Sequence, residues 1–228
     1  LEEYVFQELL KILPESPEMI ELGAYWGHYS MWLKKLRPDA SVHLVEPESG
    51  NLKVGMDNFK QNNYRGEFVQ AFVGRDYFGV DSYLRAKGIS KLDVLHADIQ
   101  GNELEMIEGC SESMRQKAID YLFISTHSES LHSEVLRKLD FYKYRVEVSS
   151  GFDFETTSYD GLIFASSPAV KKLFNTFRPM GRVQILESHP IKVVQGLMNA
   201  LNSAQSTTAS KTIKPFVRMW QWLRSKFA

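Results

Sequence analysis

The sequence predicts an α/β protein with three layers, in which a mainly parallel seven-stranded sheet with an antiparallel last strand lies between helices. Short apolar runs rich in β-branched residues recur along the chain, and amphipathic helical patterns separate most of them. Parallel neighbours need long crossovers, which place helices on both faces of a sheet. The last two runs have no helix between them, so they predict an antiparallel pair.

Seven runs have the length and composition of strands. In chain order they are residues 19–22, 41–47, 67–73, 91–98, 118–126, 144–150 and 160–167. A first helix within residues 1–13 stops at Pro14, and the later helices are expected over 28–38, 51–63, 80–88, 102–116 and 131–142. Only residues 151–158 separate the last two strands, which is too few for a crossover helix.

A helical extension is expected after the sheet. The strand pattern is lost at Pro168, so we assign residues 1–168 to the sheet domain and residues 169–228 to a carboxyl-terminal extension. Its expected parts are a helix over 168–177, a helix over 191–202, a polar linker near 203–210 and a basic, aromatic tail.

The tail over 211–228 contains four apolar residues at helical spacing, which are Phe216, Trp220, Leu223 and Phe227. Two interpretations stay open. Residues 214–227 could form an interfacial helix that contacts a membrane surface. Packing against the domain or against a second copy in a homo-oligomer is favoured, because a Trp-rich stripe usually closes a core.

Composition indicates a soluble globular protein with 43% hydrophobic residues. No apolar run is long enough to span a bilayer, and the single Cys110 suits a reducing compartment, so we expect a cytoplasmic protein, with peripheral membrane contact as the alternative. The chain starts at Leu1 without a methionine, so a leader further upstream stays open. Without the five basic residues of the tail, 22 basic residues face 28 acids, which disfavours a nucleic-acid partner.

The segment ELGAYWG follows the first expected strand, where doubly wound folds bind their ligands. Gly23 and Gly27 allow the backbone to turn tightly. A dinucleotide fingerprint needs further glycines, and Tyr25 and His28 stand in their places, so NAD and FAD fit poorly.

S-adenosylmethionine fits this turn better, because its amino acid and ribose ask for backbone groups and carboxylates. Glu21 precedes the turn, and Glu46 ends the second strand 19 residues after Gly27, at a spacing suited to the ribose hydroxyls. A turn that serves only packing remains the alternative, although the two acids together make it the less favoured one.

The fourth strand leads into LDVLHADIQGNELEMIEG, with Asp98, Gly101 and Glu103 in the pattern D-[VI]-[EQ]-G-x-E. With the turn ELGAYWGHYS and the segments VHLVEPE and YDGLIFA, this resembles the FkbM family of S-adenosylmethionine-dependent methyltransferases over residues 17–167. The final antiparallel strand is likewise typical of class I Rossmann-like methyltransferases.

The resemblance implies that residues 1–168 form the methyltransferase domain and that a hydroxyl of a sugar, glycan or secondary metabolite is the acceptor. The expected cofactor-binding residues are Glu21, Gly23, Ala24, Tyr25, Gly27, Glu46 and Asp98. Two positions depart from the family. Tyr25 replaces an asparagine that tolerates positive φ better, and His96–Ala97 replaces a common Lys-Ile.

A hydroxyl becomes a good nucleophile when a base takes its proton or a metal binds it. The candidates at the strand ends are Asp98, His127 and His96. One hypothesis makes Asp98 and His127 the catalytic pair, with His127 as the base, and another makes all three ligands of a divalent cation. A structural role for His127 also stays open, while Glu103 is expected to cap a helix and Asp160 to occupy a turn.

The sequence thus predicts an S-adenosylmethionine-dependent O-methyltransferase. The Asp-Pro-Pro-Tyr and Asn-Pro-Pro-Tyr motifs of amino-group methylation are absent, which favours an oxygen acceptor. The alternatives are a catalytically silent cofactor-binding or interaction module with the same fold and, less favoured, a nucleotide-dependent oxidoreductase.

Overall fold

The computed structural model describes residues 1–74, 77–152, 160–175, 177, 182–192, 194–195 and 198. The chain divides into two compact units, Leu1–Gln184 and Ile185–Ala228. In the described part, no helix is long and apolar enough to cross a membrane.

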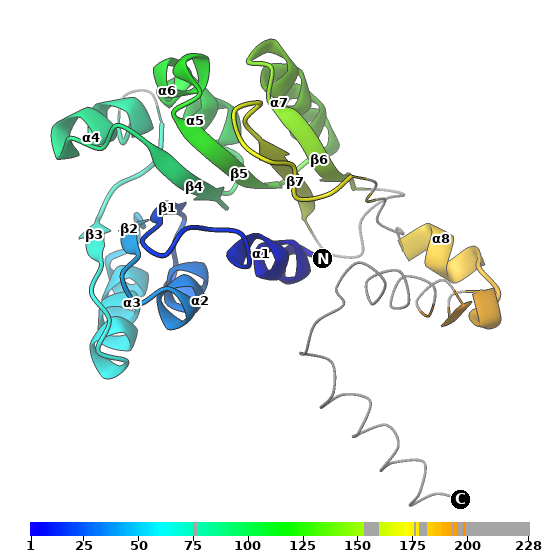
Figure 1. The fold of residues 1–228 in the computed structure, drawn as a ribbon, viewed down its shortest axis with the longest axis horizontal. Helices are drawn as coiled ribbons and strands as arrows, with labels where there is room; N and C mark the ends of the chain where they lie inside the picture. Colours follow the sequence, from blue (N-terminus) through cyan, green and yellow to red (C-terminus); the bar gives the residue numbers. More distant parts are fainter. Residues whose placement is uncertain are drawn as a thin grey trace, which may run out of the picture. The chain divides into compact units, whose positions relative to one another are not determined.

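A seven-stranded sheet forms the centre of the first unit (Figure 1), in the order β3-β2-β1-β4-β5-β7-β6. The strands are β1 (Glu18–Leu22), β2 (Ser41–Val45), β3 (Glu67–Val69), β4 (Leu92–Ala97), β5 (Ile119–Thr126), β6 (Arg145–Ser150) and β7 (Gly161–Ser166). Only β7 runs antiparallel to its neighbours, β5 and β6. The predicted fold, including the antiparallel final strand, is confirmed.

Chain order reverses at β1, which pairs with β2 on one side and with β4 on the other. Within this pairing, Glu21 lies opposite Leu44 of β2 and His96 of β4. In open parallel sheets such a switch point leaves a crevice at the carboxyl ends of the strands, where ligands bind.

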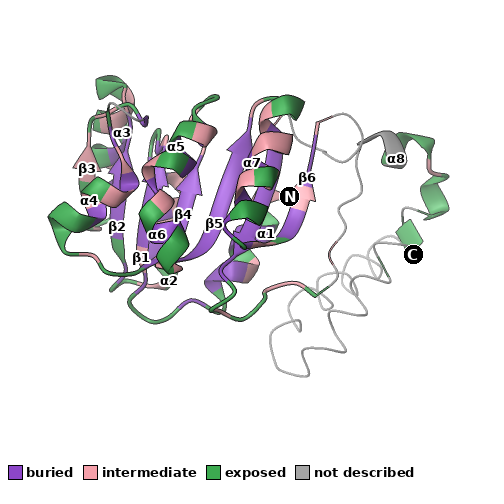
Figure 2. Ribbon diagram, turned by 90° about the horizontal axis from the view of Figure 1, so that it is seen from above, coloured by how far each residue is buried: buried purple, intermediate pink, exposed green. Residues whose placement is uncertain are grey.

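Helices cover both faces of the sheet, and each face has its own apolar cluster. These helices are α1 (Glu2–Leu10), α2 (His28–Leu36), α3 (Ser49–Gln61), α4 (Val80–Lys87), α5 (Glu103–Gly109), α6 (Ser111–Gln116) and α7 (Glu129–Phe141), and α8 (Arg182–Glu187) follows the last strand in the chain. Helices α1 to α3 bury Phe6, Leu33 and Phe59 on one face, and α4 to α7 bury residues such as Leu84 and Val135 on the other. Figure 2 shows the strands largely buried between these layers.

Two local predictions differ from the structure. The single helix expected over 102–116 is divided at Cys110 into α5 and α6. The strand expected over 67–73 ends at Val69, and only an isolated bridge at Val73 continues the pairing.

The helix predicted over 168–177 is wrong, since no described residue of this range is helical. The backbone N–H groups of Leu173 and Phe174 instead donate to Oε2 of the buried Glu147, each at 2.7 Å. Phe174 and Phe177 pack against the cluster beneath α1. Hydrogen bonds from these N–H groups to a buried carboxylate hold the segment against the sheet domain. The segment therefore forms turns and not a helix.

The remaining predictions for the extension are only partly described. The described residues of 191–202 are helical, as expected, and α8 precedes them. The linker near 203–210 and the tail helix over 214–227 lie outside the described residues.

Candidate active site

The turn after β1 is shaped by close contact with the neighbouring strand ends. Gly23 has a φ of +70°, and a Cβ atom there would lie 1.8 Å from the carbonyl oxygen of Asp98. Gly27 has a φ of +82° and begins α2, and its Cβ would lie 2.9 Å from Leu44 Cδ2. Only glycine fits the first position, because a backbone atom fills the space that a side chain would need.

Tyr25 adopts the left-handed conformation, with a φ of +48°. The departure from asparagine therefore does not prevent a positive φ at this position. The Tyr25 N–H donates to Glu46 Oε2 at 3.0 Å, while the N–H groups of Gly23 and Ala24 donate to Val45 O. These hydrogen bonds attach the turn to the end of β2. Tyr25 itself is 57% exposed.

Glu21 is a buried cap for the helix that follows the turn. Its two carboxylate oxygens accept the N–H groups of Tyr29, at 3.2 Å, and Ser30, at 2.9 Å. Burial raises the pKa of this carboxyl, and the nearby His96 and the hydrogen bonds oppose that shift. Glu21 lines the cavity described below, but its oxygens already position α2.

Glu46 is the second buried acid of the turn. Oε1 accepts the Glu48 N–H at 3.1 Å and the Asn51 amide at 3.3 Å, and Oε2 accepts the Tyr25 N–H. These bonds fix the carboxylate at the end of β2, where it also borders the cavity.

A cavity of about 920 Å³ opens at the carboxyl ends of β1, β2 and β4. This volume lies in the range of small-molecule and cofactor sites. Every residue predicted to bind the cofactor borders the cavity except Gly27. Gly27 belongs to the turn but lies close to the buried side chains of Leu44 and Phe59. The other lining residues of the cavity include Glu3, Trp26, His28, Tyr29, Glu48, Asn51, Phe72, His96, Gln100 and Asn102.

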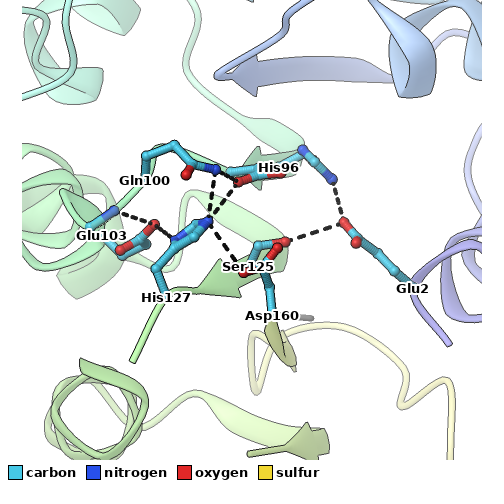
Figure 3. Close-up of polar contacts among 9 residues, drawn as sticks. Glu2, His96, Gln100, Glu103, Ser125, His127 and Asp160 are labelled. Atoms are coloured by element: carbon cyan, nitrogen blue, oxygen red, sulfur yellow. Dashed lines mark hydrogen bonds and ion pairs between the residues drawn. The ribbon is translucent and has the colours of Figure 1, made fainter. Parts of the chain in front are cut away.

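His127 lies between carboxylates (Figure 3), one of which, Asp98, borders this cavity. Its Nδ1 is 2.9 Å from Glu103 Oε1, and its Nε2 is 3.1 Å from Asp98 Oδ1. Asp160 Oδ1 is 3.9 Å from the same Nε2, and the terminal amide of Gln100 lies 2.9 Å from it. If the ring is an imidazolium, the amide must face Nε2 with its oxygen, which can accept a hydrogen bond. The hydrogen bonds to Asp98 and Glu103 raise the pKa of His127 to about 10.

The protonation of His127 decides its chemistry. An imidazolium donates from both ring nitrogens and keeps no lone pair, so it cannot accept a proton from a hydroxyl. Burial opposes the effect at Asp98, yet the hydrogen bond from His127 lowers the pKa of that carboxyl below its usual value. The structure therefore brings the predicted pair together, and the raised pKa of His127 argues against its role as the base.

His96 points elsewhere, toward α1. Its Nε2 lies 3.0 Å from Glu2 Oε1, while the ring packs between Tyr29 and Phe123. The described residues contain no group of three or more His, Cys, Asp or Glu side chains arranged to hold a metal ion. The cation hypothesis for His96, Asp98 and His127 does not fit, because carboxylates already contact both nitrogens of His127 and Nε2 of His96.

Sequence reasoning does not identify Glu2 and Glu103 as hydrogen-bond partners of the two histidines. Glu2 precedes His96 by 94 residues, and only the fold brings the two together. Glu103 was expected to cap a helix; it accepts the Gly101 N–H at 3.2 Å and also binds His127. Its place in the D-[VI]-[EQ]-G-x-E pattern is the signal that could have pointed to the second contact.

Solved structures of several methyltransferases share the fold of this chain. M. capricolum TrmK, in complex with S-adenosyl-homocysteine, is 12% identical, with a TM-score of 0.53 over 97% of this chain and 94% of that chain. Precorrin-6y C5,15-methyltransferase from Geobacter metallireducens is 16% identical, with a TM-score of 0.53 over 73% and 86%. Methyltransferase FkbM from Methylobacillus flagellatus is 18% identical, with a TM-score of 0.54 over 68% of this chain and 45% of that chain.

The fold, the cavity and a methyltransferase domain match define an S-adenosylmethionine-dependent methyltransferase of the Rossmann-like type. Residues 78–146 match the methyltransferase FkbM domain, from the start of α4 into β6. None of the curated proteins matches the chain. The domain match and the similarity of the fold to that of methyltransferase FkbM support the resemblance of this chain to the FkbM family.

Proposed function

We propose that the protein transfers a methyl group from S-adenosylmethionine to a hydroxyl of a sugar, glycan or secondary metabolite. The observation that carries this proposal is the position of Asp98. Its side chain borders the cavity and is 40% exposed, and His127 Nε2 lies 3.1 Å from its Oδ1. A fixed carboxylate of this kind can accept a hydrogen bond from a hydroxyl and orient its oxygen for attack.

The residues around the turn fit the cofactor. Glu46 offers a fixed carboxylate to the ribose hydroxyls, and Gly23 and Ala24 keep the floor of the cavity free of bulky side chains. When bound, the cofactor supplies an electrophilic methyl group on a cationic sulfonium. The acids around the cavity favour that cation over a neutral or anionic ligand.

The charge of the lining supports an uncharged acceptor. Among the described residues that border the cavity, the acids are Glu3, Glu21, Glu46, Glu48 and Asp98, and none is Lys or Arg. A phosphate or carboxylate on the acceptor would be repelled there, whereas hydroxyls can bond to Asp98, Gln100 and Asn102. This supports a neutral acceptor over a nucleic acid.

The test combines cofactor binding with methyl transfer. We expect S-adenosylhomocysteine to bind in calorimetry, and radiolabelled methyl groups to pass from S-adenosylmethionine to members of a panel of neutral glycosides. Asp98→Asn is expected to lower kcat/KM about 100-fold or more, while Asp140→Asn, a surface change at an 85% exposed side chain, leaves it unchanged. Cofactor binding without transfer to any hydroxyl compound would instead indicate the catalytically silent module.

A further inference from the structure

We propose that His96, oriented by Glu2, is the general base that takes the proton from the acceptor hydroxyl. The inference rests on the proposed function, since it assigns a role within hydroxyl methylation. It goes beyond that function because it assigns the proton transfer to His96 and Glu2 and not to Asp98 and His127.

The first argument is the fixed orientation of the ring. His96 is 3% exposed, and its ring lies 4.2 Å from the Tyr29 ring and 5.7 Å from the Phe123 ring, measured between centroids. Nε2 lies 3.0 Å from Glu2 Oε1. Figure 3 draws this contact as a dashed line between the two side chains. A carboxylate at Nε2 favours the tautomer in which Nε2 carries the hydrogen. Nδ1 then keeps its lone pair.

The second argument is the state of Nδ1. This buried nitrogen has no hydrogen-bond partner among the described residues, although its ring borders the cavity. Buried polar atoms are nearly always paired, so an unpaired one beside a ligand cavity suggests that a ligand supplies the partner. A hydroxyl hydrogen is a suitable partner for a ring nitrogen with a free lone pair.

The third argument compares the available bases. His127 is held as an imidazolium between two carboxylates, and the lowered pKa of Asp98 makes that carboxylate a weak base. Burial opposes the shift at His96, but the hydrogen bond and charge of Glu2 raise its pKa above the usual value. Of these three groups, His96 is the one with a buried ring nitrogen that has no partner among the described residues, so it is the group placed to take a proton. The charged and titratable groups that face it are Glu2 of α1, Glu21 of β1, Tyr29 of α2 and Asp98 after β4.

The proposed step balances as follows. The acceptor O–H bond breaks and its proton passes to His96 Nδ1, while the oxygen forms a bond to the methyl carbon. The bond between that carbon and the sulfonium sulfur breaks, and its electron pair stays on sulfur to give the neutral thioether S-adenosylhomocysteine. The proton on the imidazolium, whose charge Glu2 balances, later leaves to water.

The ring state is tested by NMR of ¹⁵N-histidine-labelled full-length protein between pH 6 and 10. We expect His96 to become the neutral Nε2–H tautomer within this range, assigned by loss of its signal in His96→Asn, while His127 stays protonated to about pH 10. A protonated His96 throughout, or an Nδ1–H tautomer, would overturn the proposal. This readout needs no acceptor, so it decides the inference even if no hydroxyl compound is methylated.

Kinetics with the best glycoside of the panel tests the role in transfer. We expect His96→Asn to lower kcat about 100-fold or more with S-adenosylhomocysteine affinity unchanged. The wild-type rate should rise with pH through the raised pKa of His96 to a plateau, and Glu2→Gln should move this rise to lower pH. Glu8→Gln removes an equal charge from the same helix, where Glu8 pairs with Lys11, and should leave the profile unchanged.

The outcomes separate the two proposals. An active wild type whose rate and pH profile are the same in His96→Asn and Glu2→Gln overturns the base assignment but leaves hydroxyl methylation intact. An inactive wild type with the expected ring state contradicts hydroxyl methylation alone. If His96→Asn does not fold, the pH profile of Glu2→Gln still decides the assignment.

Discussion

The carbonyl oxygen of Asp98 lies where a Cβ atom of residue 23 would be, at a separation of only 1.8 Å. The glycine turn after β1 and the acidic end of β4 are therefore in direct backbone contact. Leu22 O also accepts the Asp98 N–H at 3.0 Å, so the two strand ends are fastened at the floor of the cavity. Any change that separates them alters the cofactor end and the acceptor end together.

Gly23→Ala should accordingly be more damaging than its small size suggests. The left-handed φ alone disfavours alanine by about 1–2 kcal/mol, and the overlap with Asp98 adds to this. We expect a clear fall in Tm and loss of S-adenosylhomocysteine binding. Gly88→Ala is a matched control, since Gly88 has a φ of +68° but no atom within 4 Å of its Cβ position. Equal effects of the two changes would contradict the steric argument.

Glu46→Gln should weaken cofactor binding more than it lowers stability. The amide keeps the size of the side chain but loses one acceptor oxygen and the negative charge next to Tyr25 N–H. A hydrogen bond to a charged group contributes about 1.5–3 kcal/mol, so we expect roughly 10- to 100-fold weaker binding of S-adenosylmethionine in calorimetry. Asp57→Asn, an exposed position paired with Lys53, is the control. Unchanged affinity in Glu46→Gln would contradict the placement of the ribose.

His127 should make stability depend on alkaline pH. Its pKa is about 10 in the folded protein, because Asp98 and Glu103 accept hydrogen bonds from both ring nitrogens, and about 6.5 in an unfolded chain. A raised pKa stabilises the fold fully below the unfolded value, and this stabilisation is lost as the pH rises through the folded value. We therefore expect the free energy of unfolding to fall between about pH 6.5 and 10.

Urea unfolding across this range, in the wild type and in His127→Asn, measures the effect. The variant lacks the titrating group, so the part of the slope that belongs to His127 should disappear. Identical pH dependence in the two proteins would show that the ring is not held as an imidazolium. His43→Asn, which removes a histidine of β2 that is paired with Glu18, controls for loss of any histidine.

Sequence periodicity predicts most of this fold, because strands and crossover helices leave local patterns. The positions of Gly23, Glu46 and Asp98 at strand ends follow from the same patterns, and the structure brings all three to one cavity. The state of His127 and the contact of His96 with Glu2 could not be predicted in this way. They depend on which acids from distant elements reach each ring, and such contacts have no fixed spacing along the chain.

Glu147 offers a last test, on the segment that sequence reasoning took for a helix. The buried carboxylate accepts hydrogen bonds from Leu173 N, Phe174 N and the Ser166 hydroxyl, so one side chain fastens the segment to β6 and β7. Glu147→Ala should leave these groups unpaired and lower the free energy of unfolding by about 1–3 kcal/mol.

The rings of Phe174 and Phe177 contact the ring of Tyr4 in α1, and the same change should release both phenylalanines from it. We expect limited proteolysis to cut the variant between residues 168 and 177 while the wild type resists. Glu134→Ala, on the exposed side of α7, serves as the control for loss of an acid. If the variant resists cleavage as well as the wild type does, apolar packing of the two phenylalanines is sufficient to hold the segment, and the carboxylate is not its main anchor.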